Sequence, residues 1–135
     1  MVEDFDLDLE GWIQLQRSIL AEPWFFEQKP LSKGEVFVMI LANATFKDRR
    51  IIEPFGKRII LVRGQAFIMK RALARKAGWN RPQLERFLKY LEKHKGERFA
   101  ITQEVVNRSS DNPIEKPVAI GTIITFINFE RLCPK

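Results

Sequence analysis

The chain has 135 residues, 45% of them apolar, with eleven Phe and three Trp. This length and composition predict one domain with a sizeable core and argue against general disorder. The formal net charge is +6, and no apolar run approaches the about eighteen residues that a bilayer span needs. The single cysteine, Cys133, excludes an internal disulfide. It favours a reducing cytoplasm, and the acidic N-terminus resembles neither a signal nor a transit peptide.

The charge is unevenly distributed along the chain. Residues 1–10 hold five acids and no Lys or Arg, and we expect them to form a flexible acidic arm. Residues 70–98 instead hold ten Lys or Arg against three acids. Such a concentration favours a polyanion as partner. On charge alone, a basic surface that only confers solubility is an equal alternative.

Two helices are expected in the first third of the chain. The apolar spacing within residues 12–22 predicts a short helix that ends before Pro23. Ser32 and Glu35 have the spacing of a capping box, in which each side chain bonds the other residue's backbone N–H. The nearly continuous apolar run 36–44 then predicts a central helix that is buried on most sides.

Residues 49–68 change to a strand-like pattern. Two β-branched runs, 51–52 and 59–62, flank a turn that contains Pro and Gly, and they predict a β-hairpin. A second turn at 63–65 leads into an extended segment at 67–68.

A short helix is expected to follow the extended segment. Its pattern turns Ala72, Leu73 and Ala77 inward, and Gly78 is typical of a C-terminal stop. A helix of this length followed by a tight turn and a second helix makes a helix-turn-helix.

The second helix is predicted at residues 81–95 by several start signals. Asn80 is a good N-cap, and Gln83 is placed to complete a capping box. Trp79 is placed to pack on Leu84 as a hydrophobic staple.

This second helix has two contrasting faces. The apolar spacing directs four residues to the core: Leu84, Phe87, Leu88 and Leu91. The opposite side carries Pro82, Arg86, Lys89 and Lys93, flanked by Arg81, Gln83 and Tyr90. An ordinary solvated surface is the alternative interpretation, since Glu85 could pair with Lys89 along the helix.

A second hairpin closes the chain. Alternating β-branched and aromatic residues at 98–108 and 118–129 flank a polar tip at 109–117. The whole order predicts an α+β protein. We expect a winged helix-turn-helix with an extra β-hairpin before the helix-turn-helix, in one domain over residues 11–132.

The predicted fold gives the basic residues a role in binding double-stranded DNA. The outer face of the second helix of a helix-turn-helix enters the major groove, where Arg86 would pair with guanine and Gln83 with adenine. Lys89 and Lys93 would contact phosphates. The candidate DNA-binding residues are Arg71, Arg75, Arg81, Gln83, Arg86, Lys89, Lys93, Arg108 and Lys116. The last two belong to the wing, where two acids in the tip make a plain solvated loop an equal alternative.

The segments GWIQLQRSIL…PWF, GQAFIMKRALARKAGWNRPQLERFLKYLEK and GTIITFINFERL resemble the N-terminal winged-helix domain of bacteriophage and prophage replisome organisers. That group is similar to the DnaD-type primosomal replication initiators. The resemblance covers nearly all of residues 11–132 and implies origin binding, self-association and a nucleoid-associated role in replication initiation, in a bacterial cell or infected host. Members usually continue into a second domain, whereas this sequence ends at Lys135, and they often carry a capping Ser where Met69 stands.

Other functions are less well supported. One His (His94) and one Cys exclude a structural zinc site within one chain, and we expect no cofactor, no metal and no enzymatic activity. A transcriptional regulator with the same fold is an alternative, as is a phage module that docks on a host replication or transcription enzyme. An uncovered edge of the first hairpin would favour a homo-oligomer.

Overall fold

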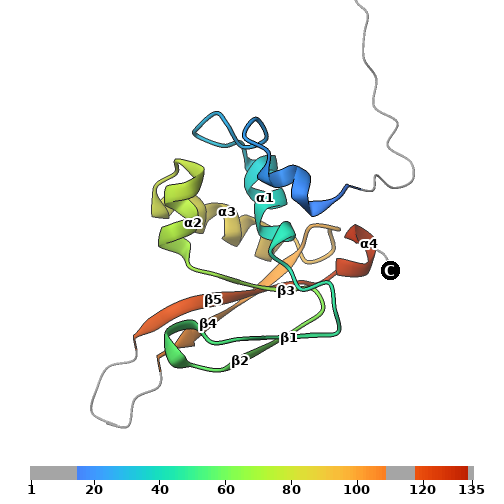
Figure 1. Ribbon diagram of the computed structural model, residues 1–135, viewed down its shortest axis with the longest axis vertical. Coiled ribbons are helices and arrows are strands. Elements are labelled where there is room, and N and C mark those ends of the chain that lie inside the picture. Colours follow the sequence, from blue (N-terminus) through green and yellow to red (C-terminus); the bar gives the residue numbers. More distant parts are fainter. Residues whose placement is uncertain (1–14, 109–117, 134–135) are drawn as a thin grey trace, which may run out of the picture.

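The computed structural model describes residues 15–108 and 118–133, so the acidic arm and the hairpin tip predicted above lie outside the described residues (Figure 1). In chain order the elements are a 3₁₀ helix (Arg17–Ala21), α1 (Lys33–Ala42), β1 (Arg49–Ile52), a 3₁₀ turn (Pro54–Gly56), β2 (Ile59–Val62), β3 (Gln65–Ile68), α2 (Lys70–Ala77), α3 (Arg81–Lys93), β4 (Ile101–Asn107), β5 (Ala119–Phe126) and α4 (Phe129–Leu132). The predicted α+β class is confirmed. Among the described residues, no helix has the length and apolar character required to cross a bilayer.

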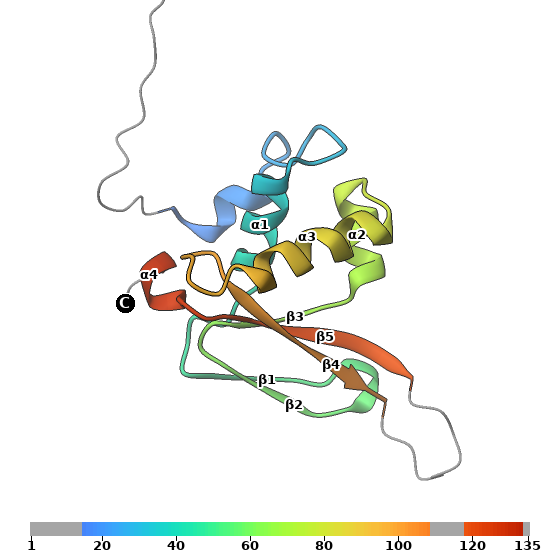
Figure 2. The same cartoon turned by 180° about the vertical axis from the view of Figure 1, so that it is seen from behind.

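The strands form two antiparallel sheets. β1 and β2 make a two-stranded ribbon, and the other three strands make a sheet in the order β3–β5–β4. The helices cover one face of the three-stranded sheet and the ribbon lies on the other (Figure 1, Figure 2). The larger core fills the space between helices and sheet, and a smaller one, built on Ile59, Leu61 and Val106, joins the ribbon to the sheet.

The prediction for the first helix is only partly confirmed. The described part of this segment forms a 3₁₀ helix of five residues without a buried side chain. Arg17 at its start reaches the C-terminal end of α1, where its guanidinium donates to the carbonyls of Ala42 and Ala44. The described part of the segment therefore contributes hydrogen bonds to the C-terminal end of α1 and buries no side chain of its own.

Helix α1 begins as the sequence predicts. The backbone N–H of Glu35 donates to Ser32 Oγ over 3.1 Å, and that of Ser32 donates to Glu35 Oε1 over 3.0 Å. Val36, Met39 and Ile40 are buried, but Val38 is 37% exposed. The helix is therefore apolar on all sides but leaves one side partly open to solvent.

Helix α2 starts at Lys70 although Met69 supplies no side-chain cap. It ends at Gly78, whose φ of 72° is left-handed, as a glycine stop requires. The prediction that Ala72 faces inward is wrong, because Ala72 is exposed and Ala74 is buried beside Leu73. The buried stripe of this short helix is therefore rotated towards Ala74, while Leu73 and Ala77 face inward as predicted.

Helix α3 also begins as predicted. The backbone N–H of Gln83 donates to Asn80 Oδ1 over 2.9 Å, and that of Asn80 donates to Gln83 Oε1 over 3.1 Å. The ring of Trp79 makes an edge-on contact with Phe87, with 5.7 Å between ring centroids, and its indole N–H donates to the carbonyl of Leu31. The helix ends at Lys93, two residues earlier than expected, because the backbone of the next residue is no longer helical.

Both predicted hairpins are present. β1 pairs with β2 from Arg49 opposite Val62 to Ile52 opposite Ile59. β4 pairs with β5 from Ile101 opposite Phe126 onward, and β5 also pairs with β3. Gly121 in β5 allows a close approach, because a Cβ there would lie 2.2 Å from the ring of Phe67 on β3.

Candidate nucleic-acid interface

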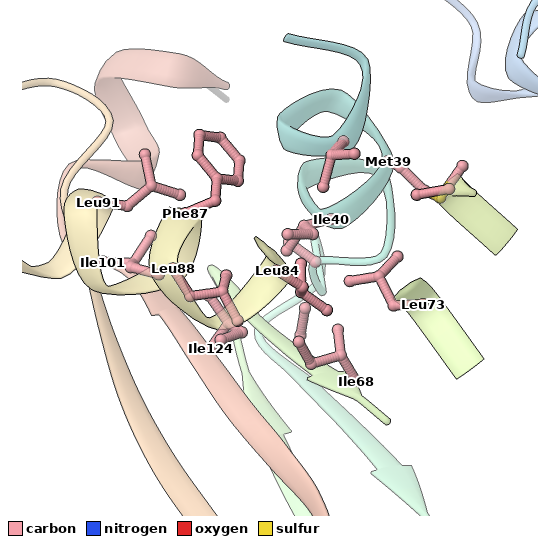
Figure 3. Close-up of a cluster of buried hydrophobic side chains, with 14 of the residues drawn as sticks. Met39, Ile40, Ile68, Leu73, Leu84, Phe87, Leu88, Leu91, Ile101 and Ile124 are labelled. Atoms are coloured by element: carbon pink, nitrogen blue, oxygen red, sulfur yellow. The ribbon is translucent and has the colours of Figure 1, made fainter. Parts of the chain in front are cut away.

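The orientation of α3 is fixed by its apolar side. Leu84 and Leu88 are 0% exposed, and Phe87 and Leu91 are also buried. These side chains point towards residues of α1, α2 and all three strands of the larger sheet (Figure 3). Because this side is anchored in the core, the opposite side of the helix is held towards solvent.

Three cations form the free side of α3. Arg86, Lys89 and Lys93 are all exposed, and we call them the α3 ridge. Among the described residues none of the three has an ion pair or a hydrogen bond, and the Arg63–Glu130 and Arg81–Glu85 pairs involve other residues. The ridge therefore presents three positively charged side chains that are not held in ion pairs.

Arg81, at the start of α3, is partly compensated. Its Nε lies 2.9 Å from Glu85 Oε1. The hydrogen bond from Arg81 holds the pKa of the Glu85 carboxyl below its ordinary value, with smaller contributions from the positive charges of Lys70 and Lys89. Glu85 thus forms its ion pair with Arg81, one turn before it on the helix, and not with Lys89 one turn after it.

Gln83 has a structural task that competes with base recognition. Its side-chain oxygen accepts the N–H of Asn80 in the capping box. Bidentate pairing with adenine uses this oxygen together with the amide NH₂. Such pairing would have to share or replace the bond that caps the helix, so Gln83 is less available than its position in the sequence suggests.

A cavity of about 460 Å³ lies where the start of α2, the start of α3 and the β4–β5 hairpin meet. Four cations line it: Lys70, Arg71, Arg81 and Arg108. Apolar residues, including Val105 and Ile120, complete its wall. The structure therefore brings together three of the residues predicted as DNA contacts and adds Lys70, which is not among the predicted contacts.

Two further predicted contacts, Arg75 and Lys116, are not among the residues that line that cavity. Arg75 is exposed on α2, one turn after Arg71, and does not line the cavity. Lys116 belongs to the hairpin tip and lies outside the described residues. The prediction for Lys116 therefore stays a prediction.

A second cavity, of about 380 Å³, flanks the other side of α3. Gln83 and Arg86 line it together with Trp79, Tyr90 and Lys33 of α1. The Tyr90 ring is nearly parallel to that of Phe99, with 5.8 Å between centroids. Lys33 was missed in the sequence because it lies 53 positions before Arg86 and only the packing of α1 beside α3 brings it close.

Residues with other chemistry are few. His94 lies at the C-terminal cap of α3, where its Nδ1 is 2.7 Å from the carbonyl of Tyr90. Burial raises the pKa of the Cys133 thiol. Residues 15–108 and 118–133 contain no group of three or more His, Cys, Asp or Glu that could hold a metal ion.

Comparison with known proteins finds no matching family model, no similar curated protein and no similar solved structure.

Proposed function

We propose that this chain is a winged-helix protein that binds double-stranded DNA and acts in phage or bacterial replication initiation. The observation that carries the proposal is the α3 ridge: Arg86, Lys89 and Lys93 are exposed and unpaired among the described residues, on a helix whose other side is buried. A rigid helix with one free cationic side suits insertion into a major groove.

The neighbouring elements support this mode of binding. α2 and α3 meet across a short turn, and the β4–β5 hairpin follows α3, with the sheet ordered β3–β5–β4. With α3 in the groove, Arg86 would reach base edges, while Lys89 and Lys93 would neutralise phosphates. Arg71, Arg75 and Arg108 would contact the backbone on either side.

The role in replication rests on the resemblance to phage replisome organisers. A transcriptional regulator would use the same contacts, so the two roles differ only in where the sites lie. Footprinting separates them: an origin-like array of sites supports replication, and sites within promoters support transcription. A module that docks on a host enzyme would instead retain its partner after the α3 ridge is removed.

The proposal is tested by the double variant Arg86→Ala, Lys89→Ala, with fluorescence anisotropy on duplex DNA at several salt concentrations. We expect affinity to fall by at least about tenfold, since a good base contact contributes about 1–3 kcal/mol. The logarithmic salt slope should fall by about 0.9, since Lys89 is the phosphate contact of the pair and each such contact contributes about 0.9.

Arg58→Ala with Lys76→Ala is the matched control, because it also removes two exposed cations, from positions outside α3 and its flanking cavities. If the affinity for duplex DNA changes neither with salt concentration nor with the α3 substitutions, duplex binding by this helix is refuted.

We further propose that the β1–β2 ribbon supports self-association. Its outer side exposes Ile51, Ile60 and Val62 at 40%, 50% and 49%. β1 pairs with β2 alone among the described strands, so its other edge is open to a strand of a second copy. A strict monomer by light scattering at high concentration would exclude this.

A further inference from the structure

A third cavity, also lined by basic residues, lies where α1 passes into β1, apart from the two cavities that flank α3. This connection runs at the end of the molecule that carries α4, away from α2 (Figure 1, Figure 2). The cavity has a volume of about 330 Å³, and we call it the α1–β1 cavity. Its lining includes Arg17, Thr45, Phe46, Lys47, Arg49 and Arg50.

The positive charge of the cavity is only partly compensated. Asp48 is the one acid between residues 42 and 52, against the cations Lys47, Arg49 and Arg50. The nearby carboxylate of Glu130 is bound by Arg63, with Nε 2.5 Å from Oε1. Counting Arg17 as well, four cations face the cavity against one acid in the same connection, which favours an anionic ligand.

Arg17 also offsets the partial negative charge at the C-terminal end of α1, which would otherwise repel an anionic ligand. The carbonyl end of a helix carries partial negative charge. Arg17 donates to the carbonyl of Ala42 and, over 3.1 Å, to that of Ala44, so it covers the end of α1 that adjoins the cavity. A negative ligand would meet a guanidinium there in place of bare carbonyls.

An aromatic ring lies among these cations. Phe46 is 54% exposed, with the Arg17 guanidinium 5.0 Å and the Lys47 ammonium 5.9 Å from its ring centroid. The backbone beside it is fixed, because Thr45 N–H donates to the Gln65 carbonyl and Gly64 N–H donates to the Thr45 carbonyl, both over 2.8 Å. The backbone that carries the ring is thus fixed, and more than half of the residue's surface is exposed.

One residue that lines the cavity carries a polar atom without a hydrogen-bond partner in the described part of the chain. Thr45 is 3% exposed, and its side-chain oxygen finds no hydrogen bond among the described residues. Buried hydroxyls are normally hydrogen-bonded. The cavity therefore combines cations, an open aromatic ring and an unused buried hydroxyl.

We infer that the α1–β1 cavity binds a segment of single-stranded nucleic acid. An unpaired base would stack on Phe46, and the adjoining phosphates would lie against Lys47 and Arg49. The cavity volume is at the lower end of the about 300–1,000 Å³ typical of ligand sites, which suits one nucleotide of a longer strand. An acidic peptide would match the cations but leave the ring without a partner.

The inference does not depend on duplex binding by α3. A base inside a duplex is paired and stacked, so it cannot reach Phe46 without leaving the helix. The protein would then hold double-stranded DNA on α3 and a single strand at its far end.

The test uses a fluorescently labelled twelve-residue oligothymidylate and a duplex of equal length. Phe46→Ala should lower single-strand affinity by at least about fivefold, since it removes one stacked base. Lys47→Ala with Arg49→Ala should also lower it and reduce the logarithmic salt slope by about 1.4, at about 0.7 per phosphate on single strands. Both variants should keep duplex affinity within about twofold of the unaltered protein.

The reciprocal variant, Arg86→Ala with Lys89→Ala, should lose duplex binding and retain single-strand binding. Arg58→Ala with Lys76→Ala should change neither beyond the general loss of charge. If single-strand affinity instead falls only with the α3 substitutions, or if no single-strand binding occurs, the inference is wrong.

A measurement on the unaltered protein covers the case in which a variant does not fold. Photocrosslinking with a 4-thiothymidine oligonucleotide, followed by mass spectrometry, should place the crosslink in residues 44–50. Crosslinks confined to α3 would overturn the site. A different outcome is that the protein binds thymidine monophosphate as tightly as the oligothymidylate and loses that binding in the Phe46 and Lys47–Arg49 variants. That result would contradict a polymeric ligand and assign the cavity to free nucleotides.

Discussion

Helices α1 and α3 start with the same local device but present different surfaces. Each begins with a capping box, formed by Ser32 and Glu35 in α1 and by Asn80 and Gln83 in α3. After Glu35, α1 has no charged residue, and its open side exposes Val38. The open side of α3 exposes cations instead. The cap sets where a helix begins, whereas the residues on its free side decide whether that side can bind a charged partner.

Truncation of a core residue should destabilise the protein by a similar amount in either helix, and this is the largest expected effect. Ile40→Ala in α1 and Leu88→Ala in α3 each remove a side chain that is at most 1% exposed. Each should lower the free energy of unfolding by about 2–5 kcal/mol, measured by urea denaturation. Lys89→Ala, next to Leu88, should change it by less than about 0.5 kcal/mol. Equal losses for Leu88→Ala and Lys89→Ala would show that α3 does not have one buried and one free side.

Substitutions in the two capping boxes should have similar effects on stability but different effects on duplex binding. Ser32→Ala and Asn80→Ala should each destabilise the fold by about 1 kcal/mol, because each leaves a backbone N–H without its side-chain acceptor. Only Asn80→Ala should also weaken duplex binding, since it loosens the turn that carries Arg81 and Gln83. Thermal unfolding and anisotropy on the same samples check this. A loss of duplex affinity in Ser32→Ala as large as in Asn80→Ala would show that the effect is not specific to α3.

The smallest effect concerns Glu85, the acid beside the α3 ridge. Glu85→Gln should raise duplex affinity by less than about fivefold, because it removes a negative charge and releases Arg81 from an exposed ion pair. The pKa of Glu85 is lowered in the folded protein. The ion pair therefore stabilises the fold at neutral pH, and that contribution is lost as the pH falls through the lowered pKa.

The difference in stability between wild type and Glu85→Gln should therefore be largest near neutrality and vanish in the acidic range. Unfolding curves at a series of pH values measure it. A difference that grows on acidification would mean that the carboxylate is not stabilised by Arg81.

Much of the fold follows from local signals. Asn80 with Gln83 and the leucine spacing after them predict both the start of α3 and its buried side, since capping and amphipathic periodicity act within a few residues. The inward face of α2 was predicted less well, because alanines tolerate either environment and only the packing of Leu73 sets the rotation. The end of α3 was also predicted two residues too late: His94 leaves the helical conformation, and its carbonyl accepts the N–H of Glu97 in the turn that leads towards β4.

The sequence by itself determined the α+β class, the two capping boxes, both hairpins and the cationic side of α3, because each depends on residues that are close along the chain. Only the tertiary structure decided that Lys70 joins Arg71, Arg81 and Arg108, that Gln83 is occupied by its cap, and that Arg17 lies beside Phe46 at the end of α1. These groupings unite residues from separate elements. Their physical cause is the burial of the apolar sides, which fixes how the elements pack and so which polar side chains share a surface.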